Sequence, residues 1–589
     1  MNNFNLFVTT MHLLRFLLLC IPLNLQAEDL ECQRLEWQLK TGDVRNIASL
    51  SRQYVQKKLG AVKVADIETL LADKKLAQSC YMAHFFASVS KEKNASLHEL
   101  KDQKFCSWLM EHPEIFEKLA FAKASGRETL AVLHNIWVKE NSQLSGMYLN
   151  MALGAALVST SREPEACMAR YDFYKKSFEE KKLFPQFDTL EPWEFQILFQ
   201  GRESLEELAW AQEYVSQKKR FKADNAGEVA CSFIPYRKTN KKGISVHAGG
   251  AFYDNKPITL QLYVEYGGVC GAVSKGAVGF LKAKGIPGYA IGQPGHCAFV
   301  WKQAPHKWVI GNNIYGWTWS EGGNGPWKGC TSIIREVARF EEGQNASGSA
   351  LCHHLGLLSP DPQQADSLLQ EALKLNPANY PVWQVLAKKV SRKTGNSEKL
   401  ALLEKFKEAF PDNAALWEHF MKSQLGIDWK KTDAYATYPF LLNSNESRDA
   451  VDVYMRNFSA QACKDIPAMS GKLPYETKTR GVFFKNWLAY YQENKIDRKV
   501  RVQTCTVLEK ALPGLLKYEK TSSQFLDFYG KALELWNDKH LLSRANTFLT
   551  AYLDKADNPE VKKKLATTGA KVADLLKDRK SLLRYSEAM

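Results

Sequence analysis

The spacing of hydrophobic residues divides the chain into regions of different character. From residue 28 to 237, apolar residues recur every three or four positions, as in segments 113–121 and 129–137. This is the period of amphipathic helices. Segment 147–158 is apolar almost throughout but too short to span a membrane, so it predicts a buried helix. The first region is therefore expected to be an α-helical domain.

Two further regions follow the first. Residues 238–345 are rich in glycine, aromatic residues, short apolar runs and turn signals, which predicts short strands. In residues 350–589 the helical period returns, with an aromatic stripe at 525–536 that we expect to be core. Here Pro377, Asn379 and Trp383 recur 34 positions later as Pro411, Asn413 and Trp417. This is the tetratricopeptide period, and it predicts a tetratricopeptide-like helical array.

Residues 1–27 have the layout of a secretory signal peptide. A short start containing Arg15 precedes the apolar segment 16–23, and the small residue Ala27 precedes two acids. We therefore expect an exported protein, periplasmic or extracellular. No later segment approaches the length of a membrane span, so no transmembrane segment is predicted.

The chain is basic, with a net charge of +15 that falls to +14 without the leader, because the leader contains Arg15 and no acid. A basic surface favours anionic partners such as cell-wall polymers or polysaccharides, and a solvated lysine-rich surface explains the charge equally well. Nucleic acid is not expected, because no nucleic-acid-binding motif is present.

Eleven of the twelve cysteines follow the leader, and none has the spacing of a zinc site. We predict no metal and no cofactor. If Cys270 stays free, ten cysteines remain, enough for five disulfides in an oxidising compartment.

Cys270 has the surroundings of a thiol nucleophile. It follows two glycines and precedes a helical pattern that Gly285 is expected to end. A cysteine at a helix N-terminus favours the thiolate. Gly267, Gly268 and Gly271 would allow a tight turn there and leave room for a substrate.

Two later residues could complete such a site. His296 opens an apolar strand, and Asn312 closes another, 307–312. A weak nucleophile needs a base, and the base needs a third group that orients it. Successive side chains of a strand point to opposite faces, so if the His296 side chain points at Cys270, the Cys297 side chain is expected to point away from it. The same alternation allows the side chain of residue 312 or of residue 313 to reach His296, but not both.

The ordered segments 268–271, 283–287, 295–301 and 308–312 resemble the transglutaminase-like family of papain-fold cysteine enzymes. The resemblance implies a Cys270–His296–Asn312 triad. It departs from the family in having Asn rather than the usual Asp at 312, and Lys284 where many members have Arg.

Together these features predict an α+β chain, with a transglutaminase-like (papain-fold) core at 238–345 between helical regions at 28–237 and 350–589. The expected function is a thioester acyl-enzyme mechanism on amide or peptide bonds of a protein or peptide substrate, with hydrolysis favoured over acyl transfer. The alternatives are an inactive scaffold, which holds a protein or glycan through its helical repeats and basic surface, and a polysaccharide-associated protein.

Three smaller expectations concern the surroundings of the site. Gln261 is a candidate oxyanion donor, with an ordinary polar strand residue as the alternative. The tryptophan-rich segment 313–323 is a candidate lid or aromatic wall, and core packing explains it equally well. His247 and His306 are expected at the surface.

Overall fold

The computed structural model describes residues 43–61, 67–90, 97–124, 126–159, 161–293, 296–313, 321–322, 326–327, 329–330, 333–391, 397–411, 413–427, 498–515 and 519–589, and the single positions 488 and 492. The predicted signal peptide, 1–27, lies outside these residues. Across the described ranges, no helix combines the length and the apolar character that a membrane span requires. The chain forms two compact units. The first contains most of the residues up to Val385, and the second contains the residues from Leu386 to the end.

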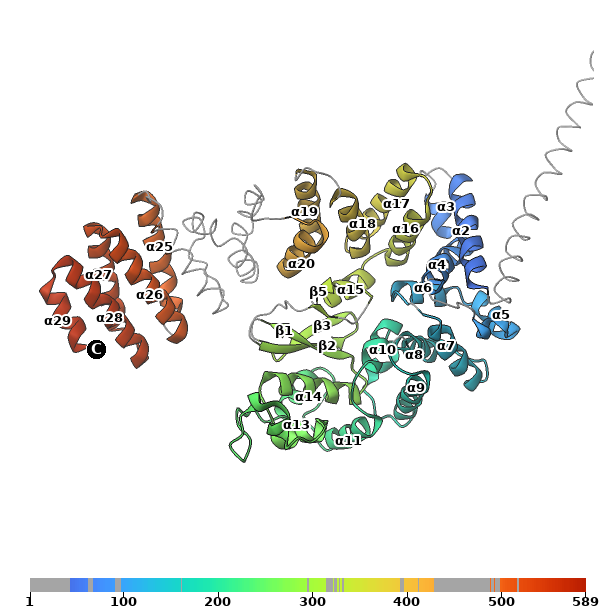
Figure 1. Cartoon of the computed structure of the whole chain (residues 1–589), viewed down its shortest axis with the longest axis horizontal. Coiled ribbons are helices and arrows are strands. Elements are labelled where there is room, and N and C mark those ends of the chain that lie inside the picture. The colour runs from blue at the N-terminus through green and yellow to red at the C-terminus, as the bar shows by residue number, and fades with distance from the viewer. Residues whose placement is uncertain are drawn as a thin grey trace, which may run out of the picture. The chain divides into compact units, whose positions relative to one another are not determined.

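The first unit begins with helices, as the periodicity predicts (Figure 1). They are α2 (Val44–Ala61), α3 (Ile67–Ala72), α4 (Lys74–Val89), η2 (His98–Lys101), α5 (Gln103–Glu111), α6 (Glu114–Phe121), α7 (Glu128–Lys139), α8 (Gly146–Leu157), α9 (Pro164–Glu179), η3 (Pro185–Thr189), α10 (Pro192–Phe199), α11 (Leu205–Ser216) and α12 (Ala226–Ser232). The predicted buried helix is α8, of which eight residues are buried. Helix α10 starts at Pro192 with a capping box between Glu191 and Glu194.

The glycine-rich region contains the strands, and three helices of the unit follow it. The elements are η4 (Val246–Tyr253), α13 (Leu260–Tyr266), α14 (Cys270–Ala283), β1 (Gly288–Gln293), β2 (His296–Ala304), β3 (Lys307–Gly311), β4 (Glu321–Gly322), β5 (Gly329–Cys330), α15 (Ile333–Glu342), α16 (Ala346–Leu358), α17 (Pro362–Leu375) and α18 (Tyr380–Ser391). Helix α14 ends as predicted, because Gly285 adopts a φ of 77° just beyond it.

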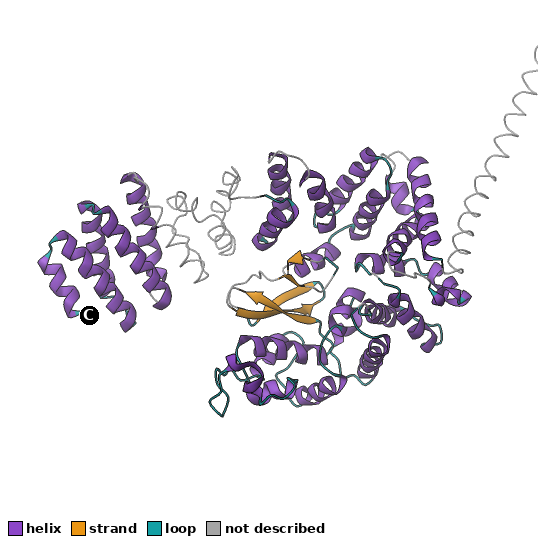
Figure 2. Ribbon diagram, viewed as in Figure 1, coloured by secondary structure: helices purple, strands orange, loops and turns teal. Residues whose placement is uncertain are grey.

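The strands form a small sheet in the order β1-β2-β3, and β4 pairs with β5 (Figure 2). Strands β2 and β3 are antiparallel, with Phe299 opposite Gly311 and Trp301 opposite Val309. A small sheet among many helices makes the fold α+β, as the sequence predicts.

Helices cover both faces of this sheet (Figure 1). On one face lie α12 and α14. The Trp301 ring of β2 packs directly on Gly227 of α12, where an added Cβ would lie 2.4 Å from Nε1 of Trp301. On the other face, Trp193 of α10 stacks on Trp308 of β3 with ring centroids 5.7 Å apart. Beside that stack, the buried side chain of Lys302 is ion-paired with Glu194. The sheet is therefore the middle layer of this part of the first unit.

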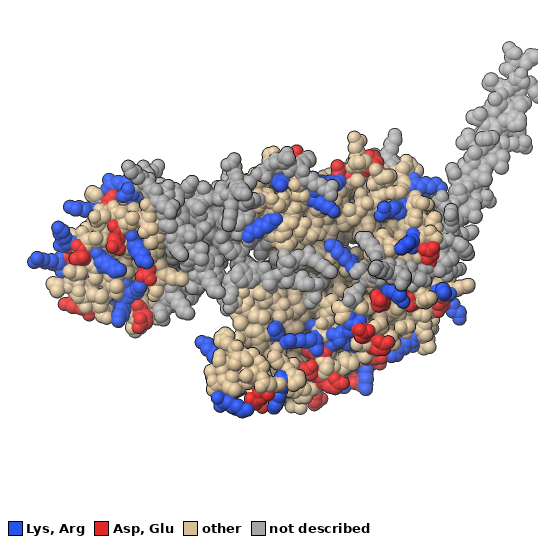
Figure 3. All heavy atoms as spheres, viewed as in Figure 1, with Lys and Arg blue, Asp and Glu red and all other residues tan. Residues whose placement is uncertain are grey.

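The second unit is helical, with elements α19 (Ser397–Ala409), α20 (Ala414–His419), η5 (Phe420–Gln424), α25 (Arg498–Leu515), α26 (Glu519–Trp536), α27 (Lys539–Leu553), α28 (Pro559–Leu576) and α29 (Arg579–Glu587). Helix α28 packs against α26, α27 and α29. Most of the predicted aromatic stripe on α26 is core, including Phe525 and Tyr529. On the face that Figure 3 shows, basic side chains of these helices alternate with acidic ones.

The 34-residue repeat has a local structural counterpart. The indole N–H of Trp383 donates to the carbonyl of Pro377 at 2.9 Å, and that of Trp417 donates to Phe410 at 2.6 Å. Each tryptophan thus closes the turn before its own helix. The assignment of these helices to the tetratricopeptide class stays a prediction.

The eight described cysteines are Cys80, Cys106, Cys167, Cys231, Cys270, Cys297, Cys352 and Cys505, and all are free thiols. None of the predicted disulfides joins two of these residues, which corrects the expectation for this set. Five of the eight are buried, where a thiol packs as a small hydrophobic group. One of them, Cys106, donates to the carbonyl of Leu100 at 2.9 Å.

Candidate active site

Cys270 is the first residue of α14 and is half-buried. Val269 is the N-cap, with extended backbone and no side-chain cap. The N–H groups of the first helical turn lie at the positive end of the helix dipole, and that of Ala272 already donates to the Val269 carbonyl at 2.9 Å. The Cys270 thiol therefore lies beside the positive end of α14.

Two glycines hold the loop before Cys270 against the segment 235–237. Gly267 and Gly268 have φ angles of 73° and 154°. The N–H of Gly268 donates to the carbonyl of Pro235 at 3.0 Å, and its own carbonyl accepts from Arg237 N–H at 2.9 Å. A Cβ at Gly267 would lie 2.1 Å from the Pro235 oxygen. The predicted tight turn is therefore present at Gly267 and Gly268.

Replacing Gly267 by alanine is expected to lower stability, because the side chain meets both a left-handed φ and a backbone oxygen. The conformation alone costs roughly 1–3 kcal/mol. The matched control is Gly271→Ala, four residues on in α14, where a Cβ meets nothing within 4 Å. Gly271→Ala should be neutral or stabilising by about 0.5–1 kcal/mol. Thermal unfolding measures both, and equal midpoints for the two variants would contradict this account of the loop.

His296 begins β2 and is fixed by one hydrogen bond. Its ring Nε2 lies 2.6 Å from the main-chain carbonyl of Asn312. Because a carbonyl only accepts, Nε2 carries the hydrogen, and the neutral ring keeps the Nδ1 lone pair as its proton acceptor. The ring is therefore held in the tautomer that a general base requires.

Asn312 follows β3 in a left-handed conformation, with φ of 50°. Its side-chain amide donates to Ser274 Oγ at 2.9 Å, to the Cys297 carbonyl at 3.1 Å and to the Cys270 carbonyl at 3.4 Å. Ser274 Oγ in turn donates to the Cys297 carbonyl at 2.8 Å. This network connects the first turns of α14 with the ends of β2 and β3.

The structure brings the three predicted residues into one network, with a different contact from the one expected. Alternation along 307–312 would direct the Asn312 side chain toward His296, whereas the main-chain carbonyl makes that contact. The strand ends at Gly311, and the left-handed turn at Asn312 redirects its side chain. Asn313 is exposed.

Cys297 does not point away from Cys270, which corrects the expectation from strand alternation. Burial raises the pKa of Cys297, and the nearby Cys270 thiol raises it further, while the Ser274 hydroxyl opposes the shift. Cys297 shares its strand face with Trp301, which packs on α12. No hydrogen bond joins the described side chains of Cys270 and His296.

A third thiol lies beside the network. Burial raises the pKa of Cys231 to about 11, and the main-chain N–H of Asn312 opposes part of that shift. A thiol with so high a pKa is almost fully protonated at neutral pH and is a poor nucleophile.

Asn312→Asp should disrupt the network, although Asp is the usual residue in the resembling family. A carboxylate cannot donate to the three acceptors that the amide serves. We expect a loss of about 1–3 kcal/mol in unfolding free energy at pH 7, as for unsatisfied buried polar groups. The control is Asn255→Asp, at an exposed asparagine with a similar left-handed φ of 57°. An Asn312→Asp protein as stable as this control would contradict the role of the amide.

Ser274 is a member of the network that the sequence does not predict, although it lies four residues after Cys270 and so on the same helix face.

Gln261 lies on α13 rather than on a strand, and its Oε1 is buried without a hydrogen bond to any described group. Its oxyanion role stays a prediction. The candidate lid at 313–323 lies almost entirely outside the described residues. His247 and His306 are exposed, as predicted.

Comparison with known proteins adds no relative. No family model, no curated protein and no solved structure matches the chain. Within the described ranges, no three histidine, cysteine or acidic side chains converge to hold a metal ion.

Proposed function

We propose that the chain is an exported cysteine enzyme with a transglutaminase-like core at 238–345, acting on amide or peptide bonds. The observation that carries the proposal is that Asn312 is hydrogen-bonded to both other members of the candidate triad. Its carbonyl accepts from the His296 ring, and its amide reaches the Cys270 carbonyl. A nucleophile at a helix N-terminus, packed against a sheet that carries the base, supports the same proposal.

In the proposed reaction, Nδ1 of His296 takes the proton of the Cys270 thiol. The thiolate attacks the substrate carbonyl, and N–H groups at the start of α14 stabilise the oxyanion. The C–N bond then breaks, the imidazolium protonates the departing amine, and a thioester forms on Cys270. Water, activated by His296, hydrolyses the thioester and releases the acid. Catalytic hydrogen bonds commonly tighten only when substrate binds, and the proposal requires this of the Cys270–His296 pair.

We favour hydrolysis over acyl transfer, because water is always present and the described residues around Cys270 show no lysine-binding feature. To test the reaction class, the protein is incubated with a tryptic peptide mixture, with and without a primary amine. New peptide termini or deamidated glutamine with water alone, together with an acid-trapped acyl adduct on Cys270, support the proposal. Products in which the amine replaces water would indicate transfer, and the absence of both products and adduct would overturn the enzyme assignment.

A second candidate is an inactive scaffold that binds a protein or glycan through tetratricopeptide-like helices. It is favoured by the lack of a hydrogen bond between Cys270 and His296 and by the stacked helices α25–α29. If the chain is a scaffold, Cys270→Ala should leave its binding of a protein or glycan unchanged.

An anionic polysaccharide or cell-wall partner remains a proposal, and its binding should weaken as salt is raised.

A further inference from the structure

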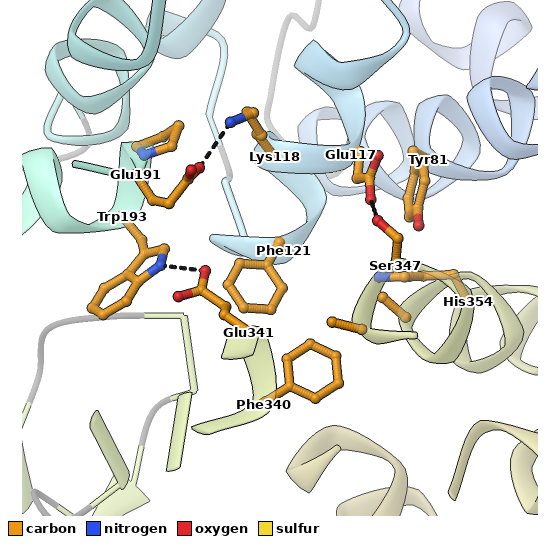
Figure 4. A pocket seen from close by; sticks show the side chains of 13 residues that line it. Tyr81, Glu117, Lys118, Phe121, Glu191, Trp193, Phe340, Glu341, Ser347 and His354 are labelled. Atoms are coloured by element: carbon orange, nitrogen blue, oxygen red, sulfur yellow. Dashed lines mark hydrogen bonds and ion pairs between the residues drawn. The ribbon is translucent and has the colours of Figure 1, made fainter. Parts of the chain in front are cut away.

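A cavity of about 270 Å³ lies in the first unit, lined by residues of α4, α6, α10, α15 and α16 (Figure 4). None of the candidate active-site residues lines it. Most of its wall is apolar. Three carboxyl groups also line it, those of Glu117 on α6, Glu191 at the N-cap of α10 and Glu341 on α15. A mostly apolar cavity with a few polar groups is the usual form of a small-molecule site.

Aromatic rings form a large part of the wall. Phe121 and Phe340 stack with centroids 6.0 Å apart and planes at 14°. Trp193 also stacks against Trp308 of β3. In Figure 4, Glu341 extends from α15 between Trp193 and Phe121. The faces of such rings attract cations and also pack against apolar groups.

The lining contains more carboxyl groups than basic side chains. Among the described residues that line the cavity, Lys118 is the one lysine or arginine. It is already paired with Glu191 at 2.7 Å and donates to Asn150. Glu117 accepts a hydrogen bond from Ser347, and Glu341 accepts one from Trp193 Nε1 at 2.8 Å. Neither Glu117 nor Glu341 forms an ion pair with a described basic residue.

The surroundings of Glu341 disfavour a negative charge on its carboxyl group. Burial raises the pKa of Glu341 to about 8, and the carboxylates of Glu194 and Glu191 add to the shift. The Trp193 hydrogen bond and the Lys302 ammonium oppose it only in part. At the opposite end of the cavity, burial lowers the pKa of His354, which is therefore neutral and supplies no positive charge.

We propose that this cavity binds a small organic cation, a primary ammonium group on an apolar body. The ammonium group pairs with the Glu341 carboxylate, and Glu117 adds to the negative field. The apolar body lies against Phe121, Phe340 and Trp193. This site does not depend on the activity of Cys270.

The first test uses three probes of one shape on the unaltered full chain: 2-phenylethylammonium, 2-phenylethanol and 3-phenylpropionate. Calorimetric titration at pH 8 should give binding of the amine at least tenfold tighter than of the alcohol, and no binding of the carboxylate. Equal affinity for amine and alcohol, tighter binding of the carboxylate, or no binding of the amine would each overturn the proposal.

The second test assigns the site to Glu341. Glu341→Gln keeps the oxygen that accepts from Trp193 and removes the charge, so it should fold normally and bind the amine at least tenfold more weakly. Glu342→Gln, at the exposed next residue of α15, should bind like the unaltered chain. Circular dichroism verifies the fold of both variants, and an unchanged amine affinity in Glu341→Gln would overturn the assignment.

The third test uses pH. Because Glu341 is mostly protonated below about pH 8 in the free protein, binding the cation releases a proton. The amine affinity should therefore rise by up to tenfold for each pH unit between pH 6 and 8 and then level off. An affinity independent of pH in this range would contradict pairing with Glu341.

Discussion

Replacing Cys270 by alanine is expected to lower turnover of an amide or peptide substrate at least ~10³-fold, because the covalent route through a thioester is lost. His296→Ala should cost a similar factor, since His296 is the proposed acceptor of the thiol proton. Residues of one catalytic unit act together, so the double variant should be little worse than either single one. Steady-state kinetics on the peptide found by the product screen measures all three.

The matched control is Cys167→Ala. Cys167 is buried on α9, and burial raises the pKa of its thiol to about 11. The Cys167→Ala variant also replaces one cysteine by alanine, and it should keep normal turnover. Turnover that survives in Cys270→Ala, or is lost equally in Cys167→Ala, would exclude Cys270 as the nucleophile.

Lys302→Met is expected to destabilise the first unit by about 3–5 kcal/mol, as for buried ion pairs that lose one partner. The side chains of Lys302 on β2 and Glu194 on α10 are each only 4% exposed. Burial raises the pKa of Glu194, and the Lys302 ammonium opposes that rise. Removing the ammonium leaves an uncompensated carboxyl group beside the Trp193–Trp308 stack.

Thermal and denaturant unfolding at pH 7 measure this loss. Lys307→Met, at an exposed position of the neighbouring strand, should change the midpoint little. The Glu194→Gln/Lys302→Met double variant should recover part of the stability, because no charge is then buried alone. A Lys302→Met protein as stable as the Lys307→Met control would show that the pair does not connect α10 to the sheet.

Much of the local structure around the site could be predicted from the sequence. Apolar spacing after Cys270 and the glycine at 285 define α14, whose observed end agrees with the prediction. The apolar run from His296 and the segment after Lys307 give β2 and β3. These are local signals, in which a few neighbouring residues determine the backbone conformation.

The arrangement of the side chains could not be predicted in the same way. Alternation divides β2 into two faces but does not say which face meets α14, so the direction it predicts for Cys297 is wrong. The left-handed turn at Asn312 also breaks the alternation on which its side-chain direction depended. The Lys302–Glu194 pair joins residues 108 positions apart, which no local pattern reveals.

The contacts of Asn312 give a physical reason for an asparagine at the position where the resembling family usually has an aspartate. An aspartate could orient a histidine with its carboxylate, but here the main-chain carbonyl makes that contact and the amide donates elsewhere. An amide is the group that suits those acceptors. The asparagine therefore suits a network in which the main-chain carbonyl, and not the side chain, holds the His296 ring.

The rate of alkylation of Cys270 tests the central claim most directly. Iodoacetamide labelling of the native chain, followed by peptide mass spectrometry, gives a rate for each free thiol at each pH. The account predicts that Cys270 reacts faster than Cys231 and Cys297, and that His296→Ala slows it at least tenfold at pH 7. An unreactive Cys270, or a rate that His296→Ala leaves unchanged, would contradict a thiol activated by His296.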